Sequence, residues 1–78
     1  MDYEMIEKKI KDFCEEMYSD ACRVETGQDV YNLRAIAYGA LRFACNNLFP
    51  AFNEELAEWW DEYMWMQFEE LIRKIRYN

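Results

Sequence analysis

Carboxylates are the residues of this chain whose number and spacing could support acid–base or metal chemistry. Its 78 residues include 16 aspartates and glutamates and no histidine. Glu58 with Glu62, and Glu15 with Glu16, are close enough in sequence to resemble paired carboxylates. A di-iron bundle, however, needs a Glu-x-x-His motif from each of two helices, and a general acid needs a buried carboxyl with a raised pKa. Because the helical period places Glu58 and Glu62 on a charged face, we expect no catalysis by these carboxylates.

Motifs for nucleophilic or phosphate chemistry are also missing from the sequence. Ser19 and Thr26 are its single serine and single threonine, and neither lies in a nucleophile elbow. Gly27 and Gly39 are solitary, so they form no phosphate-binding loop. We therefore expect a non-enzymatic protein with no cofactor and no bound metal.

Cysteine usage indicates the redox environment. Cys14, Cys22 and Cys45 cannot all pair with one another, and no CxxC motif is present. A disulfide framework or a zinc cluster is therefore not expected. The first eleven residues alternate charged and apolar side chains and contain no signal-type apolar core. These features predict free thiols and a cytoplasmic location, where thiols stay reduced.

The charge balance bears on the partners that the chain could bind. Nine basic against 16 acidic residues give a formal net charge of −7. The two basic clusters, residues 8–11 and 73–76, would lie at opposite ends of a three-helix bundle, so they form no continuous stripe for phosphate groups. Arg34 and Arg42 interrupt the longest weakly charged run, residues 30–52, which argues against a membrane span. We expect a soluble protein that binds neither nucleic acid nor membrane directly.

The apolar pattern predicts the fold class. Hydrophobic residues make up 53% of the chain and aromatic residues 18%, which favours a folded domain over a disordered one. Apolar residues recur every three or four positions between the few glycine and proline interruptions, as amphipathic helices require. We predict an all-α fold, a small three-helix up-down-up bundle that could dimerise into a larger helical bundle, with helices at about residues 3–24, 29–48 and 54–76 of a single domain.

Capping residues predict where the helices begin and end. Asp2 can cap the first helix, and Gly27 follows its expected end. Thr26 or Asp29 can cap the second helix, and Asn53 the third. The core predicted from the apolar stripes comprises Ile6, Ile10, Phe13, Met17, Leu33, Ile36, Ala37, Ala40, Leu41, Ala44, Trp60, Met64, Phe68 and Leu71.

An acidic run in the third predicted helix is the first candidate binding surface. Between Glu54 and Glu70 the chain carries seven acidic residues and no basic one. Acidic residues four apart destabilise a helix by some tenths of a kcal/mol per pair. One interpretation is a solvated face, partly offset by lysines 8, 9 and 11 at the same end of the bundle. The other is a docking surface for a basic partner, with Glu58, Asp61, Glu62, Trp65 and Glu69 as its residues.

Trp65 is the unusual member of this set. At about 100° per residue it falls among acidic residues, away from the apolar stripe of its helix. It could cover the apolar stems of Arg73 or Arg76, or it could serve as an aromatic anchor for a partner.

A second candidate surface lies on the second predicted helix. Tyr and Arg are enriched in protein interfaces, and Ala35 beside Gly39 would let another helix approach closely. Alternatively, the first or third helix already covers this stripe, and acidic side chains pair with its arginines. The predicted self-association residues are Tyr31, Arg34, Tyr38, Gly39 and Arg42.

Two functions from different classes fit these features. The first is a protein–protein interaction module, a small acidic inhibitor or modulator that binds a basic protein such as one that handles nucleic acid, as an inhibitor from a phage or mobile element would. The second is a structural homo-oligomeric bundle subunit with no inhibitory role, which buries its surplus of 14 aromatic residues in a homodimer.

Overall fold

Three helical segments make up the fold, and the described residues contain no strand. The computed structural model describes residues 3–47 and 54–77. Two α-helices, α1 (Tyr3–Ala21) and α2 (Gly27–Asn47), precede a third segment composed of α3 (Glu54–Trp59), the π-helix η1 (Trp60–Met64) and α4 (Trp65–Tyr77). The predicted all-helical class with three helices is confirmed. The predicted end of the second helix at Leu48 and the predicted caps Asp2 and Asn53 lie outside the described residues.

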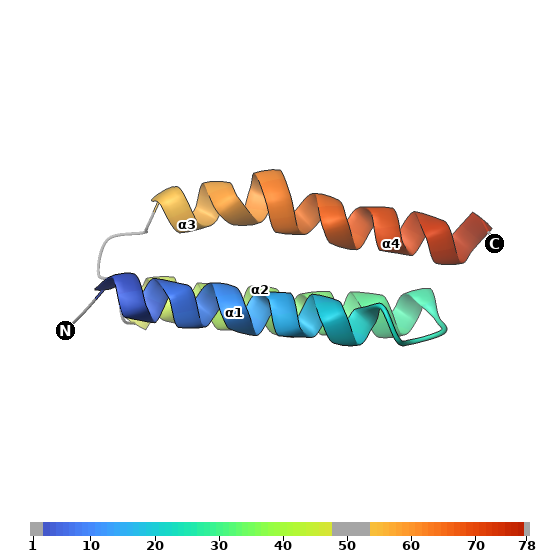
Figure 1. Ribbon diagram of the computed structural model, residues 1–78, viewed down its shortest axis with the longest axis horizontal. Helices are drawn as coiled ribbons and strands as arrows, with labels where there is room; N and C mark the ends of the chain where they lie inside the picture. Colours follow the sequence, from blue (N-terminus) through green and yellow to red (C-terminus); the bar gives the residue numbers. More distant parts are fainter. Residues whose placement is uncertain (1–2, 48–53, 78) are drawn as a thin grey trace.

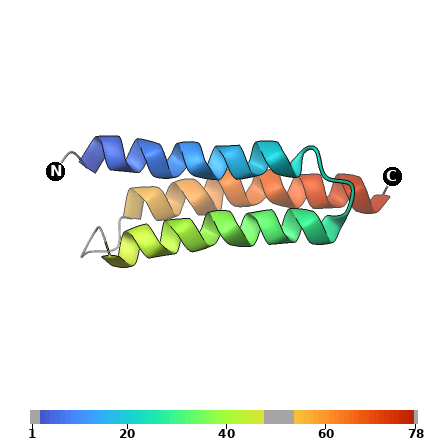
Figure 2. The same cartoon turned by 90° about the horizontal axis from the view of Figure 1, so that it is seen from below.

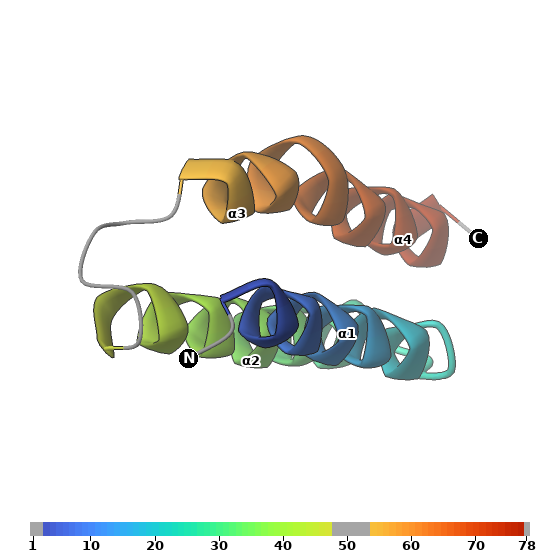
Figure 3. The same cartoon turned by 60° about the vertical axis from the view of Figure 1, so that its left-hand side comes forward.

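The segments form an elongated molecule, 45 × 18 × 16 Å between Cα positions. α2 runs back along α1, and the third segment lies along both of them (Figures 1 and 2). Figure 3 shows the third segment on one side of the α1–α2 pair. None of the helices in the described ranges is long and apolar enough to cross a membrane.

The turn between α1 and α2 differs from the prediction at both helix ends. α1 ends at Ala21, not at Val24, because the backbone N–H groups of Arg23 and Val24 bond to carbonyls three residues back, at 3.0 and 3.4 Å. Gly27 was predicted to follow the end of α1, but it is the first residue of α2, and its φ is not positive. Such i−3 bonds tighten the last turn of a helix, so no left-handed glycine is needed there.

Thr26 caps α2, as one of the two predicted alternatives proposed. Its Oγ1 accepts a hydrogen bond from the Asp29 backbone N–H at 3.2 Å and donates one to the Asp29 carboxylate at 2.8 Å. The first bond satisfies an N–H group that a helix start otherwise leaves unpaired, and the second gives the Thr26 hydroxyl proton an acceptor. The helix consequently begins at Gly27, two residues before the predicted start at residue 29.

A π-helical turn interrupts the third segment. The backbone N–H of Trp65 bonds to the carbonyl of Trp60, five residues back. The apolar residues Leu56, Trp60 and Met64 recur every fourth position, and Phe68 and Ile72 continue this spacing. In a regular α-helix each step of four residues drifts by about 40° around the axis. The wide turn of η1 cancels much of that drift, so all five side chains are buried.

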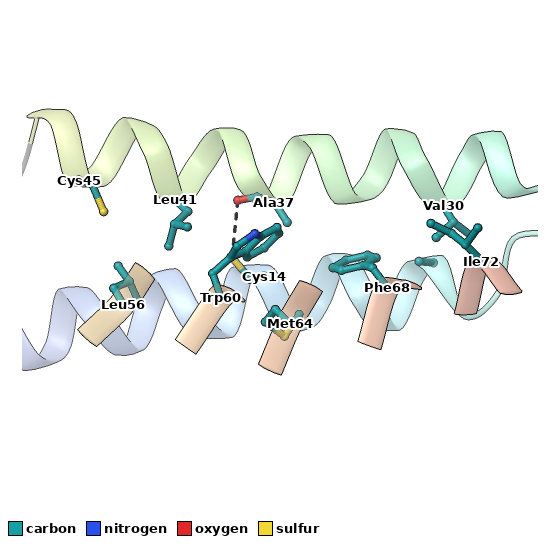
Figure 4. Close-up of a cluster of buried hydrophobic side chains, with 11 residues drawn as sticks. Cys14, Val30, Ala37, Leu41, Cys45, Leu56, Trp60, Met64, Phe68 and Ile72 are labelled. Carbon is teal, nitrogen blue, oxygen red and sulfur yellow. Dashed lines mark hydrogen bonds between the residues drawn. The ribbon is translucent and has the colours of Figure 1, made fainter. Parts of the chain in front are cut away.

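The core lies where the third segment meets the α1–α2 pair (Figure 4). The Phe68 ring packs edge-on against Tyr18 at 5.5 Å between centroids and lies 6.2 Å from Trp60. Six of the fourteen predicted core residues are fully buried, namely Ala37, Leu41, Ala44, Trp60, Met64 and Phe68.

The other eight predicted core residues are not fully buried, because the prediction did not identify which side of each helix faces a neighbouring helix. Phe13 and Ile36 were predicted to be buried but are 36% and 52% exposed. Both belong to the α1–α2 pair, which the third segment covers on one side only (Figure 3). Half-buried predicted residues are Ile6, Ile10, Met17, Leu33, Ala40 and Leu71, and the buried residues that the prediction omitted are Cys14, Ala21, Val30, Cys45, Leu56 and Ile72.

Candidate functional site

Arg34 of α2 joins the two candidate surfaces that the sequence analysis treated as separate. Its guanidinium carbon lies 4.1 Å from the centre of the Trp65 ring and 4.8 Å from that of the Tyr31 ring. Its Nη1 donates a hydrogen bond to Glu69 Oε1 at 2.5 Å. The Arg34 side chain is only 14% exposed. A guanidinium stacked on aromatic faces and paired with a carboxylate uses both of the interactions for which arginine is suited.

This cluster supports the alternative in which another helix covers the stripe of α2, at least for Arg34. Trp65 and Glu69 reach Arg34 because of the wide turn of η1. Relative to an uninterrupted α-helix, this turn rotates α4 about its axis by the angle of about one residue, roughly 100°. Trp65 stacks on Arg34, and the cation–π contacts of the described residues include none between Trp65 and Arg73. The ring remains 41% exposed, so part of it is still accessible.

The rest of the predicted self-association stripe is divided between covered and open positions. The Tyr38 ring packs against Trp60 of η1 at 5.5 Å, and Arg42 lies over Tyr38 at 5.9 Å. Within the described ranges, Arg42 has no carboxylate partner. A Cβ built at Gly39 would meet no heavy atom within 4 Å outside its own helical backbone. The close approach expected at Gly39 is therefore not made within the described part of the chain.

The acidic row of α3 and η1, defined here as Glu58, Asp61 and Glu62, is exposed along its length. Across residues 3–47 and 54–77, none of these three carboxylates forms an ion pair. The structure thus separates the five predicted partner-binding residues into two groups. Glu58, Asp61 and Glu62 lie free on the surface, whereas Trp65 and Glu69 are engaged by Arg34.

Two of the three lysines expected to offset the acidic row are engaged elsewhere. Lys8 Nζ pairs with Asp12 at 2.6 Å, and the hydrogen bond to Asp12 raises the pKa of Lys8. Lys11 pairs with Glu7 at 3.4 Å and lies 5.4 Å from the centre of the Trp59 ring. Both ion pairs join residues four apart on α1, so they leave the charge of the acidic row uncompensated.

The cysteines show no arrangement that would activate a thiol. Cys14 is fully buried, and its Sγ lies 3.6 Å from the Ala37 carbonyl, to which it donates a weak hydrogen bond (Figure 4). Burial raises the pKa of Cys14 to about 11, which disfavours the nucleophilic thiolate. Cys45 is buried, Cys22 is exposed, and all three thiols are free. No group of three or more Cys, Asp or Glu side chains in the described ranges is placed to hold a metal ion.

An apolar groove between α1 and α2, of about 440 Å³, is a surface that sequence reasoning missed. Its lining comes from these two helices alone, and Lys9 is its one charged residue. A signal in the sequence was the lack of charge along the outer side of α2. The apolar residues that line the groove are Ile6, Ile10, Phe13, Ala40, Phe43 and Ala44.

Comparisons with known proteins identified no relative of this chain. No protein-family model, curated protein or solved structure matches the chain.

Proposed function

We propose that this protein is a non-enzymatic protein–protein interaction module, an up-down-up bundle that binds a basic protein through the acidic row Glu58, Asp61 and Glu62. The observation that carries the proposal is that these three carboxylates are exposed and form no ion pair within the described residues. A row of unpaired like charges raises the energy of the free protein, and a basic partner would relieve that repulsion.

The engagement of Lys8 and Lys11 supports this proposal over a merely solvated face. The interpretation as a solvated face took the charge of the acidic run to be partly offset by lysines 8, 9 and 11. Lys8 instead pairs with Asp12, and Lys11 pairs with Glu7 beside the Trp59 ring. A partner that supplies lysines or arginines would find the carboxylates of the acidic row available.

Trp65 adds apolar contact area at the edge of the proposed surface. Arg34 fixes the ring by stacking at 4.1 Å, while 41% of the residue stays exposed. A pre-positioned aromatic ring loses little conformational entropy when a partner packs on it. Trp65 would then serve as the anchor, and the carboxylates would steer the encounter.

The partner class that fits best is a basic protein that handles nucleic acid. An acidic helical surface could occupy a groove that otherwise receives phosphate groups, which would make the protein an inhibitor or modulator of the kind encoded by phages and mobile elements. We expect this interaction in the cytoplasm, because three free thiols suit a reducing compartment.

The experiment is affinity capture from the native host, followed by binding kinetics with the captured protein. The test variant carries Glu58→Lys and Glu62→Lys, and the control carries Glu15→Lys and Glu25→Lys, which change net charge equally at exposed positions away from the acidic row. We expect the test variant to associate at least tenfold more slowly at low salt, with a flatter salt dependence, and the control to lose much less. Equal losses in both variants, or capture of only acidic proteins, would overturn the proposal.

A further inference from the structure

The side of the α1–α2 pair that faces away from the third segment carries an exposed apolar surface. Phe43 is 64% exposed, Ile36 is 52% exposed and Phe13 is 36% exposed. Phe13 and Phe43 line the apolar groove, together with half-buried Ile6 and Ile10. Figures 1 and 3 show the third segment on one side of the pair, and only α1 and α2 line the groove, so no helix within residues 3–47 and 54–77 covers it.

A strip of the outer side of α2 beside this groove, bounded by exposed Asp29 at one edge and exposed Arg42 at the other, carries no charge, although the chain as a whole has a net charge of −7. Arg34 lies on the opposite side of α2, where it stacks on Trp65, and Arg42 lies at the edge of the uncharged strip, over Tyr38. Gly39 leaves open space at the centre of the uncharged strip. The residues of this strip, spaced three or four apart, are Gln28, Asn32, Ile36, Gly39, Phe43 and Asn46.

We infer that a second copy of this chain docks on this surface, groove against groove. The distribution of charge selects that occupant. Two copies with a net charge of −7 repel each other least through a face such as this groove, whose single charged lining residue is the basic Lys9. A basic partner would find no carboxylate row in the groove, because the acidic row Glu58, Asp61 and Glu62 lies on the third segment.

The available area is of the size that a stable dimer needs. In the direction that separates α1 from α2 (Figure 2), the molecule measures 16 Å between Cα positions, and it is 45 Å long. The Cα outline of that face is about 700 Å² in projection, and side chains extend beyond this outline, so the face has room for the roughly 800 Å² of accessible surface that each partner buries in a standard protein interface. Phe43 and Ile36 provide the large apolar side chains that the centre of an interface requires.

The rim of the groove indicates the orientation of the second copy. Lys9 and Glu16 are exposed, lie seven residues apart and so share one side of α1, about two helical turns from each other. Neither forms an ion pair within the described ranges. In a twofold dimer whose two α1 helices cross antiparallel, Lys9 of each copy lies opposite Glu16 of the other. The twofold symmetry then forms the same Lys9–Glu16 ion pair twice across the interface.

Sedimentation equilibrium of the full chain tests the docking surface. We expect a mass of twice 9.6 kDa at high concentration and a dimer that tightens as salt rises from about 0.05 to 0.5 M, because salt screens the repulsion between the copies. Phe43→Gln should raise the dissociation constant at least tenfold, whereas Met66→Gln, equally apolar and 52% exposed on α4, should leave it unchanged. Gly39→Leu should weaken the dimer as well, because its side chain would fill the space that the second copy occupies.

Circular dichroism checks that each variant is folded. We expect Phe43→Gln to fold, because the Phe43 side chain is largely exposed. A monomer at every concentration up to about 1 mM would overturn the inference. Equal weakening by Phe43→Gln and Met66→Gln would overturn it too, since the interface would then lie elsewhere. The acidic-row variant Glu58→Lys with Glu62→Lys should still dimerise, so that failure of the dimer and failure of basic-partner binding are separate results.

A charge exchange tests the orientation. Lys9→Glu alone should weaken the dimer several-fold, because it sets two acidic residues against each other. Lys9→Glu combined with Glu16→Lys should restore the affinity of the parent chain. A double variant as weak as the single one would overturn the antiparallel arrangement.

Discussion

Arg34 stacks on the Trp65 ring, with its guanidinium carbon 4.1 Å from the ring centre, and so ties α2 to α4. The two residues are 31 positions apart in the sequence and were predicted to serve different surfaces, Arg34 for self-association and Trp65 for a partner. Their contact depends on η1, whose wide turn rotates α4 relative to α3. The pair fixes one side of Trp65 and leaves the rest of the ring exposed.

Replacing Arg34 with lysine should destabilise the protein by about 1 kcal/mol in urea unfolding. Lysine keeps the charge but loses the planar group that stacks on Tyr31 and Trp65. Arg42→Lys is the matched control, because Arg42 lies 5.9 Å from the Tyr38 ring and pairs with no carboxylate in the described ranges. Equal effects of the two substitutions would show that stacking at Arg34 contributes nothing specific.

Truncation of Phe68 to alanine should cost about 3–5 kcal/mol of unfolding free energy. The side chain is fully buried and packs against Tyr18 and Trp60. Phe43→Ala removes the same atoms from a 64% exposed position and should change stability by less than about 0.5 kcal/mol in dilute protein. A loss under about 1 kcal/mol for Phe68→Ala would contradict the packing described here.

Deletion of Asp61 should convert η1 to regular α-helix without disturbing the core. Once one residue is removed, Leu56, Trp60, Met64, Phe68 and Ile72 all fall within about 60° of one side of an unbroken α-helix. We expect full helicity by circular dichroism and an unfolding free energy within about 1 kcal/mol of the parent chain.

The control for this deletion is removal of Ala35, an exposed residue of the regular helix α2. That deletion rotates Ala37 and Leu41 by about 100° away from the core and should cost about 3 kcal/mol or more. If deletion of Asp61 lowered the unfolding free energy as much as deletion of Ala35, the idea that the π-turn accommodates one extra residue in the helix would be wrong.

Stability should fall in mild alkali because of Cys14. Burial raises the pKa of this thiol to about 11 from an ordinary value of 9.0, so the folded state holds the proton more tightly than the unfolded state. The resulting stabilisation is complete below pH 9 and is lost as pH rises toward 11, by about 2–3 kcal/mol. Burial also raises the pKa of Tyr18, so the Cys14→Ala variant supplies the background slope. Parallel pH profiles for the two proteins from pH 8 to about 11 would contradict this assignment.

The sequence by itself determined the helices and much of what they bury. Apolar residues at helical spacing, and turn residues between them, predicted three helical segments, because helix formation depends on local propensity and on a one-sided apolar stripe. Thr26 was identifiable as a cap of α2, because its Oγ1 bonds to Asp29 only three residues away. Ala37, Trp60 and Phe68 were predicted in the core for the same reason, and all three are buried.

The tertiary structure alone decided which side of each helix meets a neighbour. A helical stripe shows that Phe13 and Ile36 share a side with core residues, but it does not show that the third segment covers only one side of the α1–α2 pair. The every-fourth spacing of apolar residues from Leu56 to Ile72 was visible in the sequence. That spacing alone does not show whether the segment is a continuous α-helix or contains a π-turn; the packing of Phe68 and Ile72 against α1 and α2 decides it. That packing rotated Trp65 and Glu69 onto Arg34 and left Glu58, Asp61 and Glu62 exposed, because burying a continuous apolar stripe is worth more than keeping one turn of regular helix.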